Sequence, residues 1–233
     1  MINTVKIIGS GLIGTSIGLA LKTNSKAGTT QVLMQDTDLE AQKLAQSLVD
    51  PAADDSIKSF DLVVVAVPIS ENIKTVSQNL KENPNSIVVD LASVKSNLLN
   101  EVEGLSENRQ NFVSLHPMAG REFVGPSNAR ADLFEGRAWL ISKTSVSSSK
   151  SVDVARKLGT DLGATTYELS PNEHDATIAA VSHMPQILSS LMGDLLVSED
   201  AKALNFAGQG LRDVSRLADS DSTMWSHLLL ENT

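Results

Sequence analysis

The sequence of 233 residues contains only four histidines, and one of them, His116, opens the polar stretch HPMAGRE directly after the apolar run NFVSL. A neutral imidazole has a pKa near the pH at which most enzymes work, so it is suited to proton transfer. A histidine in this place could also end a strand and hydrogen-bond only to the backbone. His116 is therefore a candidate general base, with a structural role as the alternative.

Two further stretches carry polar side chains that could serve a site. Ser93 lies in DLASVK after another apolar run, where it could contact a substrate or act as a turn residue or helix cap. His183 lies in SHMP, just before a proline, where it could line a pocket or be a core histidine bonded to a carbonyl group. Both alternatives stay open on these residues alone.

The stretch GQGLRDVSR holds two arginines one helical turn apart, Arg212 and Arg216. A guanidinium group offers two parallel donors, which match the two oxygens of a carboxylate. Asp213 could instead pair with Arg216 at the surface, an interaction worth roughly a few tenths of a kcal/mol. The spacing fits a surface ion pair, and the two guanidinium groups stay candidates for a role at a site.

A metal site is not expected from this sequence. There is no cysteine, which excludes thiolate ligands. His174 and His183 are separated by about 2.5 turns of an α-helix, which would place their side chains on opposite faces of it. Their spacing therefore does not favour a shared metal ion.

The segment GSGLIG matches the pattern G-x-G-x-x-G between a strand-like run and a helical pattern. The first glycine would permit a tight turn, the second would let the backbone approach a pyrophosphate, and the third would let helix and sheet pack closely. The N–H groups at the start of the helix would face the anion. The candidate cofactor-binding residues here are Gly9, Gly11, Leu12, Ile13 and Gly14.

An acidic residue follows the second strand-like run, about 20 residues after the glycines, where it should meet the ribose hydroxyls of a dinucleotide. This residue is Asp36, and with Asp38 nearby it should repel a 2′-phosphate, so NAD is expected rather than NADP. The apolar strand that ends in Ala-Val-Pro would border the nicotinamide half, with Val67 and Pro68 at the contact.

The elements that must position these residues alternate along the first two thirds of the chain. Strands are expected at 4–9, 31–35, 61–68, 86–92, 111–115, 137–142 and 164–169, and helices at 12–21, 38–48 and about 150–162. The serine-rich segment 143–151 should be a loop that caps the last of these helices. Such alternation predicts an α/β fold with a doubly wound, mostly parallel Rossmann-type sheet.

After about residue 170 only helical patterns remain. Val181, Met184, Leu188, Leu191 and Leu195 form an apolar stripe on one long helix, in which Pro185 should cause a kink. About 60 residues are too few to bury such faces alone, so they should pack on the first domain and on a second subunit. We therefore expect an NAD-binding domain at 1–169 and a smaller all-α domain for substrate binding and dimerisation at 170–233.

Composition and charge narrow the choice of partners. The chain carries 28 acidic and 19 basic residues, a net charge of −9, which argues against nucleic acid or an anionic membrane as a partner. Without cysteines, a leader pattern or an apolar run of about 20 residues, it reads as a cytoplasmic protein.

Taken together, GSGLIGTSIGLALK, DLASVK, HPMAGRE, NEHD…SHMP, GLRDVSR and SDSTMW resemble the prephenate/arogenate dehydrogenase family of tyrosine biosynthesis. The resemblance implies NAD-dependent oxidative decarboxylation of prephenate to 4-hydroxyphenylpyruvate by a homodimer. Arogenate dehydrogenase, which gives tyrosine directly, is the alternative, and a non-catalytic dinucleotide sensor is a more distant one. Family members often continue with further helices, whereas this sequence ends soon after Trp225.

The resemblance also implies a role for each candidate residue. The histidine matching His116 accepts the proton of the ring hydroxyl, and the serine matching Ser93 orients that hydroxyl. The arginine matching Arg216 holds the ring carboxylate. The residues matching Asp213 and His183 organise and line the same pocket.

Overall fold

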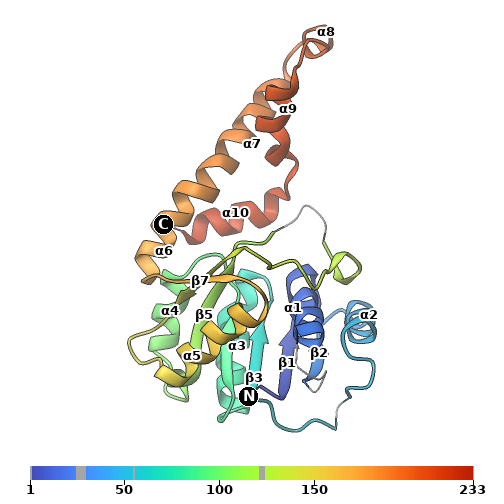
Figure 1. Cartoon of the computed structure of the whole chain (residues 1–233). Helices are drawn as coiled ribbons and strands as arrows, with labels where there is room; N and C mark the ends of the chain where they lie inside the picture. The colour runs from blue at the N-terminus through green and yellow to red at the C-terminus, as the bar shows by residue number, and fades with distance from the viewer. Residues whose placement is uncertain (1, 25–29, 55, 121–123, 233) are drawn as a thin grey trace. The chain divides into compact units, whose positions relative to one another are not determined.

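Seven short runs form the strands of one sheet (Figure 1). They are β1 Thr4–Ile8, β2 Gln31–Gln35, β3 Leu62–Val65, β4 Ile87–Asp90, β5 Phe112–Pro117, β6 Ala138–Ser142 and β7 Thr165–Glu168, in the spatial order β2-β1-β3-β4-β5-β6-β7. All neighbours pair in parallel except β5 and β6. The expected mostly parallel, doubly wound sheet is confirmed.

This computed structural model describes residues 2–24, 30–54, 56–120 and 124–232. The chain divides into two compact units, Met1–Asn172 and Glu173–Thr233. The helices between the strands of the first unit are α1 Leu12–Asn24, α2 Leu39–Val49, α3 Ile69–Glu82, α4 Ser96–Glu103 and α5 Ser149–Asp161. Two short 3-10 turns, Arg109–Asn111 and Pro126–Asn128, complete it.

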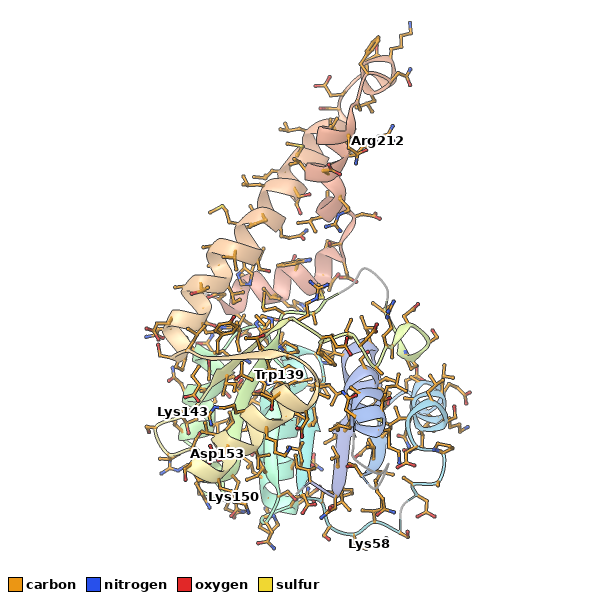
Figure 2. All side chains as sticks on the ribbon, in the orientation of Figure 1. Lys58, Trp139, Lys143, Lys150, Asp153 and Arg212 are labelled. Atoms are coloured by element: carbon orange, nitrogen blue, oxygen red, sulfur yellow. The ribbon has the colours of Figure 1, made fainter. Side chains whose placement is uncertain are left out.

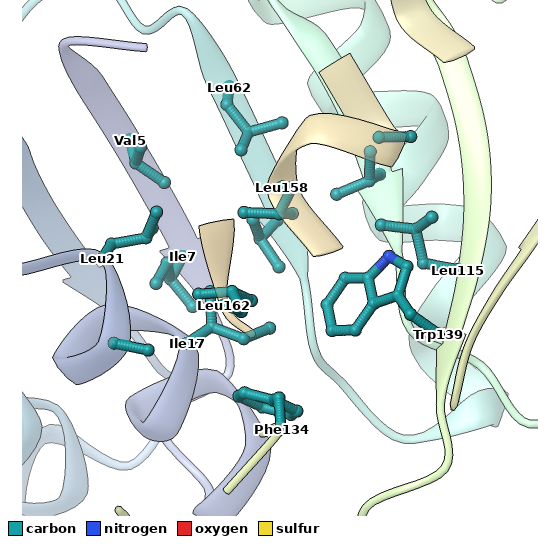
Figure 3. Packing of buried hydrophobic residues seen from close by; sticks show 14 of the residues in the cluster. Val5, Ile7, Ile17, Leu21, Leu62, Leu115, Phe134, Trp139, Leu158 and Leu162 are labelled. Atoms are coloured by element: carbon teal, nitrogen blue, oxygen red, sulfur yellow. The ribbon is translucent and has the colours of Figure 1, made fainter. Parts of the chain in front are cut away.

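Two apolar layers hold the helices against the sheet, because successive strand residues face opposite sides. In β3, Leu62 and Val64 join the cluster under α1, α2 and α5, whereas Val63 and Val65 join the cluster under α3 and α4. All four residues are buried, as expected for a central parallel strand. Figure 3 shows the first layer, in which Trp139 lies between Leu115, Phe134 and the residues of α5.

The strand limits differ from the expected ones at two ends that matter for the site. β3 ends at Val65, three residues before Pro68, which has no N–H group to donate to a neighbouring strand. β5 continues through Pro117, because the antiparallel strand β6 pairs Leu140 with His116 and Trp139 with Pro117. The serine-rich segment behaves as expected, since the Ser148 side chain accepts from the N–H of Ser151 at the start of α5.

The second unit is entirely helical in its described residues. It contains α6 Pro171–Ile178 (which begins two residues before the unit), a π-helical turn Ala179–His183, α7 Met184–Val197, α8 Ala201–Leu204, α9 Gln209–Ser215, a 3-10 turn Arg216–Asp219 and α10 Ser222–Glu231. Helix α7 packs against α9 and the 3-10 turn (Figure 1).

The expected kink at Pro185 takes the form of the π turn that precedes it. The N–H of Met184 donates to the carbonyl of Ala179, five residues back, so this turn contains one residue more than an α-helical turn. Pro185 then stands in the first turn of α7, where its missing N–H costs little. The disruption therefore lies upstream of the proline rather than at it.

The apolar stripe of the long helix does not face the rest of its own unit. Val181, Met184, Leu188, Leu191 and Leu195 are between 53% and 68% exposed. The face of α7 that packs within the unit instead carries small or polar residues, namely Gln186, Ser189 and Gly193. Among the described helices, none combines the length and apolarity needed to cross a membrane.

Candidate active site

The five parallel strands all end at one edge of the sheet, and each end carries residues that the sequence singled out. Gly9 to Gly14 follow β1, Asp36 follows β2, Val67 and Pro68 follow β3, Ser93 follows β4, and His116 is the penultimate residue of β5. Ligands of open α/β sheets bind along this edge. The first unit thus brings its predicted site residues to a common side of the sheet.

The turn between β1 and α1 leaves no room for side chains at two of its glycines. Gly9 has φ of +106°, and a Cβ atom there would lie 2.2 Å from the carbonyl oxygen of Ala66. A Cβ atom at Gly14 would lie 2.1 Å from the carbonyl oxygen of Gly9, so α1 packs directly on the turn. A Cβ atom at Gly11 would meet none of the described atoms within 4 Å, so the backbone there borders open space.

Asp36 is held beside this turn by backbone N–H groups. One carboxylate oxygen accepts from the N–H of Ser10 at 2.5 Å, and the other accepts from the N–H of Asp38 at 2.9 Å. The Asp38 carboxylate is used differently, because it accepts from two N–H groups at the start of α2. Asp36 therefore presents its negative charge next to the glycine turn, while Asp38 caps a helix.

A buried lysine joins the ends of β4 and β5. The ammonium group of Lys95 donates to the carbonyl oxygen of Ala92 at 2.6 Å and to that of Leu115 at 2.7 Å, and it lies 3.9 Å from Asp90. Both charged side chains are completely shielded from solvent. Burial raises the pKa of Asp90, and the positive charge of Lys95 opposes that shift.

This lysine bonds the residues that immediately precede Ser93 and His116. Ser93 lies in the turn after β4 and is not the cap of α4, because that helix begins at Ser96 with Lys95 in the cap position. His116 is partly buried and extends two residues past Ser114, the last β5 residue paired with β4. The end of the HPMAGRE stretch, Arg121 and Glu122, lies outside the described residues.

The second unit holds His183 in a buried polar cluster at the π turn. Its Nδ1 atom lies 3.1 Å from the amide nitrogen of Asn232, and its ring packs edge-on against Trp225 with 5.9 Å between ring centroids. Burial lowers the pKa of His183, a shift that the Asp175 carboxylate opposes and His174 reinforces. The imidazole is therefore neutral near pH 7.

The expected placement of His174 and His183 on opposite faces is wrong. Both are buried, and they lie close enough for a charge on His174 to affect the pKa of His183. The cause is the π turn between them, which adds a residue to one turn and rotates His183 toward His174. Among the described residues, no group of three or more His, Cys, Asp or Glu side chains is placed to hold a metal ion.

Arg216 and Asp213 lie on exposed surfaces of the second unit, as does Arg212, which Figure 2 labels on α9. The Asp213 carboxylate accepts from the side-chain amide of Gln209 at 2.7 Å. Arg216 opens the 3-10 turn, whose next residue, Leu217, accepts through its carbonyl oxygen from Gln186 of α7 at 2.7 Å. Gln186 lies one turn beyond His183, so this bond ties the Arg216 turn to the helix that carries His183.

Comparison with known families matches both parts of the chain. Residues 17–168 match the family described as prephenate dehydrogenase, nucleotide-binding domain, and residues 170–233 match prephenate dehydrogenase, dimerization domain. The chain belongs to the prephenate dehydrogenase family. The resemblance that the sequence motifs suggest is thereby confirmed.

Individual members of the prephenate dehydrogenase family support the same assignment. The probable prephenate dehydrogenase NovF of Streptomyces niveus is 34% identical over 98% of this chain and 62% of its own length. The prephenate dehydrogenase of Bacillus subtilis is 30% identical over 100% of this chain and 65% of its own length. The chain thus spans less than two thirds of these curated relatives.

The fold of this chain is also similar to that of a solved structure. The crystal structure of prephenate dehydrogenase from A. aeolicus superposes with a TM-score of 0.86 at 24% sequence identity. The match covers 100% of this chain and 83% of that one. The chain therefore shares its fold with that structure.

Sequence reasoning missed three residues that contact or adjoin the predicted ones within their own units. Lys95 and Asp90 both belong to the DLASVK motif. Two ionisable residues at the end of an apolar strand could have indicated a buried ion pair. Asn232 gave no signal, because an asparagine near the end of a helix is ordinarily read as its cap. Only the folded chain brings it to His183.

Proposed function

We propose that the chain is an NAD-dependent prephenate dehydrogenase, which converts prephenate to 4-hydroxyphenylpyruvate by oxidative decarboxylation. The observation that carries this proposal is the bond of one buried ammonium group, that of Lys95, to the residues preceding both Ser93 and His116. It fixes a hydroxyl and an imidazole at the sheet edge that also carries the glycine turn. Family membership gives the substrate class.

The glycine turn suits a dinucleotide. The open space at Gly11 admits a pyrophosphate, and the first turn of α1 supplies N–H groups that lack acceptors within the helix. The Asp36 carboxylate stands where ribose hydroxyls would donate to it. The related A. aeolicus enzyme was crystallised with NAD+ and hydroxyphenyl propionate. Bound NAD supplies a hydride acceptor for the carbinol carbon of the substrate.

Side chains of the protein then accept the hydroxyl proton and bind the substrate carboxylate. His116 accepts the proton of the ring hydroxyl, and Ser93 orients that hydroxyl by a hydrogen bond. As the hydroxyl carbon becomes a ketone, the ring can accept the electron pair released when its carboxylate leaves as CO₂. Arg216 holds that carboxylate with two parallel donors, so the ring stays oriented during the reaction. The gain of an aromatic ring drives the sequence forward.

The decisive experiment measures NADH formation with prephenate and with arogenate, side by side, on the same preparation. Prephenate turnover well above arogenate turnover is the expected result. A preference for arogenate would show that arogenate, and not prephenate, is the substrate. Absence of turnover with both compounds, alongside measurable NAD binding, would favour a dinucleotide-binding protein without this activity.

We also propose that the active form is a homodimer. The second unit matches a dimerization domain, and the stripe from Val181 to Leu195 leaves large apolar side chains more than half exposed. Burying apolar surface is the main source of stability at such interfaces. The stripe runs along one face of α7, which suits a helix–helix contact with a second copy of the chain.

A further inference from the structure

The buried cluster around His183 contains an asparagine to which the proposed reaction assigns no role. The side-chain nitrogen of Asn232 lies 3.1 Å from the backbone carbonyl oxygen of Asp175 and 3.1 Å from Nδ1 of His183. Asn232 is the cap residue at the end of α10, while Asp175 and His183 belong to α6 and the π turn. One amide group thus joins both ends of the second unit.

The orientation of this amide follows from its partners. A backbone carbonyl oxygen can only accept a hydrogen bond, so the Asn232 atom beside it must be the NH₂ group rather than the oxygen. The same NH₂ group has a second hydrogen, which points to Nδ1 of His183. Nδ1 must therefore accept, and it cannot carry a proton.

A neutral imidazole that accepts at Nδ1 carries its proton on Nε2. Burial lowers the pKa of His183, which keeps the ring in this neutral form. The edge-on contact with Trp225 restrains the ring plane. Asn232 and Trp225 together leave the Nε2–H group as the single donor of His183.

The Nε2–H group of His183 finds no acceptor within the described part of the chain. The Nε2 atom is buried and has no hydrogen-bond partner among the described residues. A buried donor without a partner costs about 1–3 kcal/mol, so native proteins rarely keep one unless a ligand or water completes it.

We propose that Asn232 is a positioning residue that fixes His183 in the Nε2–H tautomer, so that His183 donates a hydrogen bond to an anionic or carbonyl oxygen of the bound substrate. His183 is then a donor and not a second base. This inference rests on the proposed function for the identity of the substrate, whereas the tautomer itself is a property of the free protein.

The neighbouring histidine provides an internal contrast. Nδ1 of His174 lies 2.8 Å from the carboxylate of Asp175, and an ionised carboxylate can only accept. His174 therefore carries a proton on Nδ1, the nitrogen that His183 leaves bare. The two histidines should therefore differ at Nδ1 in a single spectrum, with a proton on Nδ1 of His174 and none on Nδ1 of His183.

The tautomers can be read by two-bond ¹H–¹⁵N correlation NMR of the histidine rings in the full chain, without any ligand. Only four histidines contribute, and the His174→Gln and His183→Gln variants assign the two signals of interest. We expect a protonated Nε2 and a bare Nδ1 for His183. A proton on Nδ1 of His183 in the wild-type protein would overturn the proposal, whatever the variants do.

The role of Asn232 is tested by Asn232→Asp, which replaces the donor with an acceptor of the same shape. We expect Nδ1 of His183 to become protonated in this variant. The matched control is Asn83→Asp, since Asn83 is also a helix cap residue, at the end of α3, outside this cluster. An unchanged His183 pattern in Asn232→Asp, with the circular dichroism of the wild type, would show that Asn232 does not set the tautomer.

The donor role is tested by kinetics with prephenate. His183→Gln keeps an N–H donor near the position of Nε2, whereas His183→Glu puts an acceptor of equal size there. We expect the KM of the glutamate variant to exceed that of the glutamine variant on the order of 10- to 100-fold. Equal KM values would remove the donor role. Failure of the wild-type protein to turn over prephenate would instead refute the proposed function and leave the NMR result standing.

Discussion

The ammonium group of Lys95 lies 3.9 Å from the carboxylate of Asp90, and neither side chain is reached by solvent. The lysine also donates to two carbonyl oxygens, those of Ala92 and Leu115. Because these carbonyls belong to the residues just before the proposed catalytic serine and histidine, Lys95 links the chain after β4 to the end of β5 next to both. A buried ion pair by itself adds little to stability, and we expect this one to act mainly by holding the neighbouring residues in position.

Replacing this lysine should strongly destabilise the protein. Lys95→Met leaves the buried Asp90 carboxylate without its counter-charge and two carbonyls without a donor, which costs about 3–5 kcal/mol of unfolding free energy. Urea unfolding measures the effect. The double variant with Asp90→Asn should recover part of the loss, and an additive loss would show that the two side chains are not coupled.

The cost of that substitution should also depend on pH. The folded-state pKa of Asp90 is raised by burial, so the protonated form favours folding, and this contribution is lost as the pH rises through the folded pKa. Lys95→Met removes the charge that opposes the shift and raises the pKa further. The stability gap between variant and wild type should therefore narrow as the pH is lowered from neutrality. A constant gap in unfolding curves across this range would contradict the assignment.

How far the sequence predicts this site depends on the range of the interactions. The seven strands and the glycine turn are local patterns, so they were found with errors of a few residues at their ends. The extension of β5 through His116 was missed because it depends on pairing with β6, which follows later in the chain. The contact of His183 with Asn232 depends on how α10 folds back on the π turn, which no local spacing encodes.

Removal of the proposed base should affect the chemical step and leave the cofactor in place. His116→Asn keeps a polar side chain at the end of β5 but cannot accept the hydroxyl proton at neutral pH. We expect kcat with prephenate to fall on the order of 10²- to 10⁴-fold, with the affinity for NAD unchanged in a fluorescence titration. A turnover number close to that of the wild type would exclude His116 as the base.

The acid beside the glycine turn should determine the choice between NAD and NADP. Asp36→Ser removes the negative charge that accepts from the N–H of Ser10 and would repel a 2′-phosphate. The variant should lose affinity for NAD and gain affinity for NADP. Asp38→Ser is the control, because its carboxylate caps α2, and it should alter stability more than cofactor preference. The same shift in both variants would assign the preference to overall charge instead.

The two exposed arginines offer a matched test of carboxylate binding. Arg216→Ala should raise the KM for prephenate on the order of 10- to 100-fold, because a charged, two-donor contact is lost. Arg212→Ala removes the same charge one helical turn earlier and should leave KM near the wild-type value. Equal effects of the two substitutions would point to a general electrostatic attraction of the anionic substrate rather than to a specific contact at Arg216.

The apolar stripe of α7 predicts how the oligomer should respond to a charge. Leu188 and Leu191 are 55% and 57% exposed in the single chain, so a charged residue at either position costs the folded monomer little. Across a two-fold interface, however, each substitution would bring like charges together from both copies. Leu188→Asp should therefore convert a dimer to a monomer in sedimentation velocity, while its circular dichroism stays that of the wild type. Leu39→Asp, at a site 64% exposed on α2, is the control and should remain dimeric. A Leu188→Asp protein that still sediments as a dimer would place the interface on another surface.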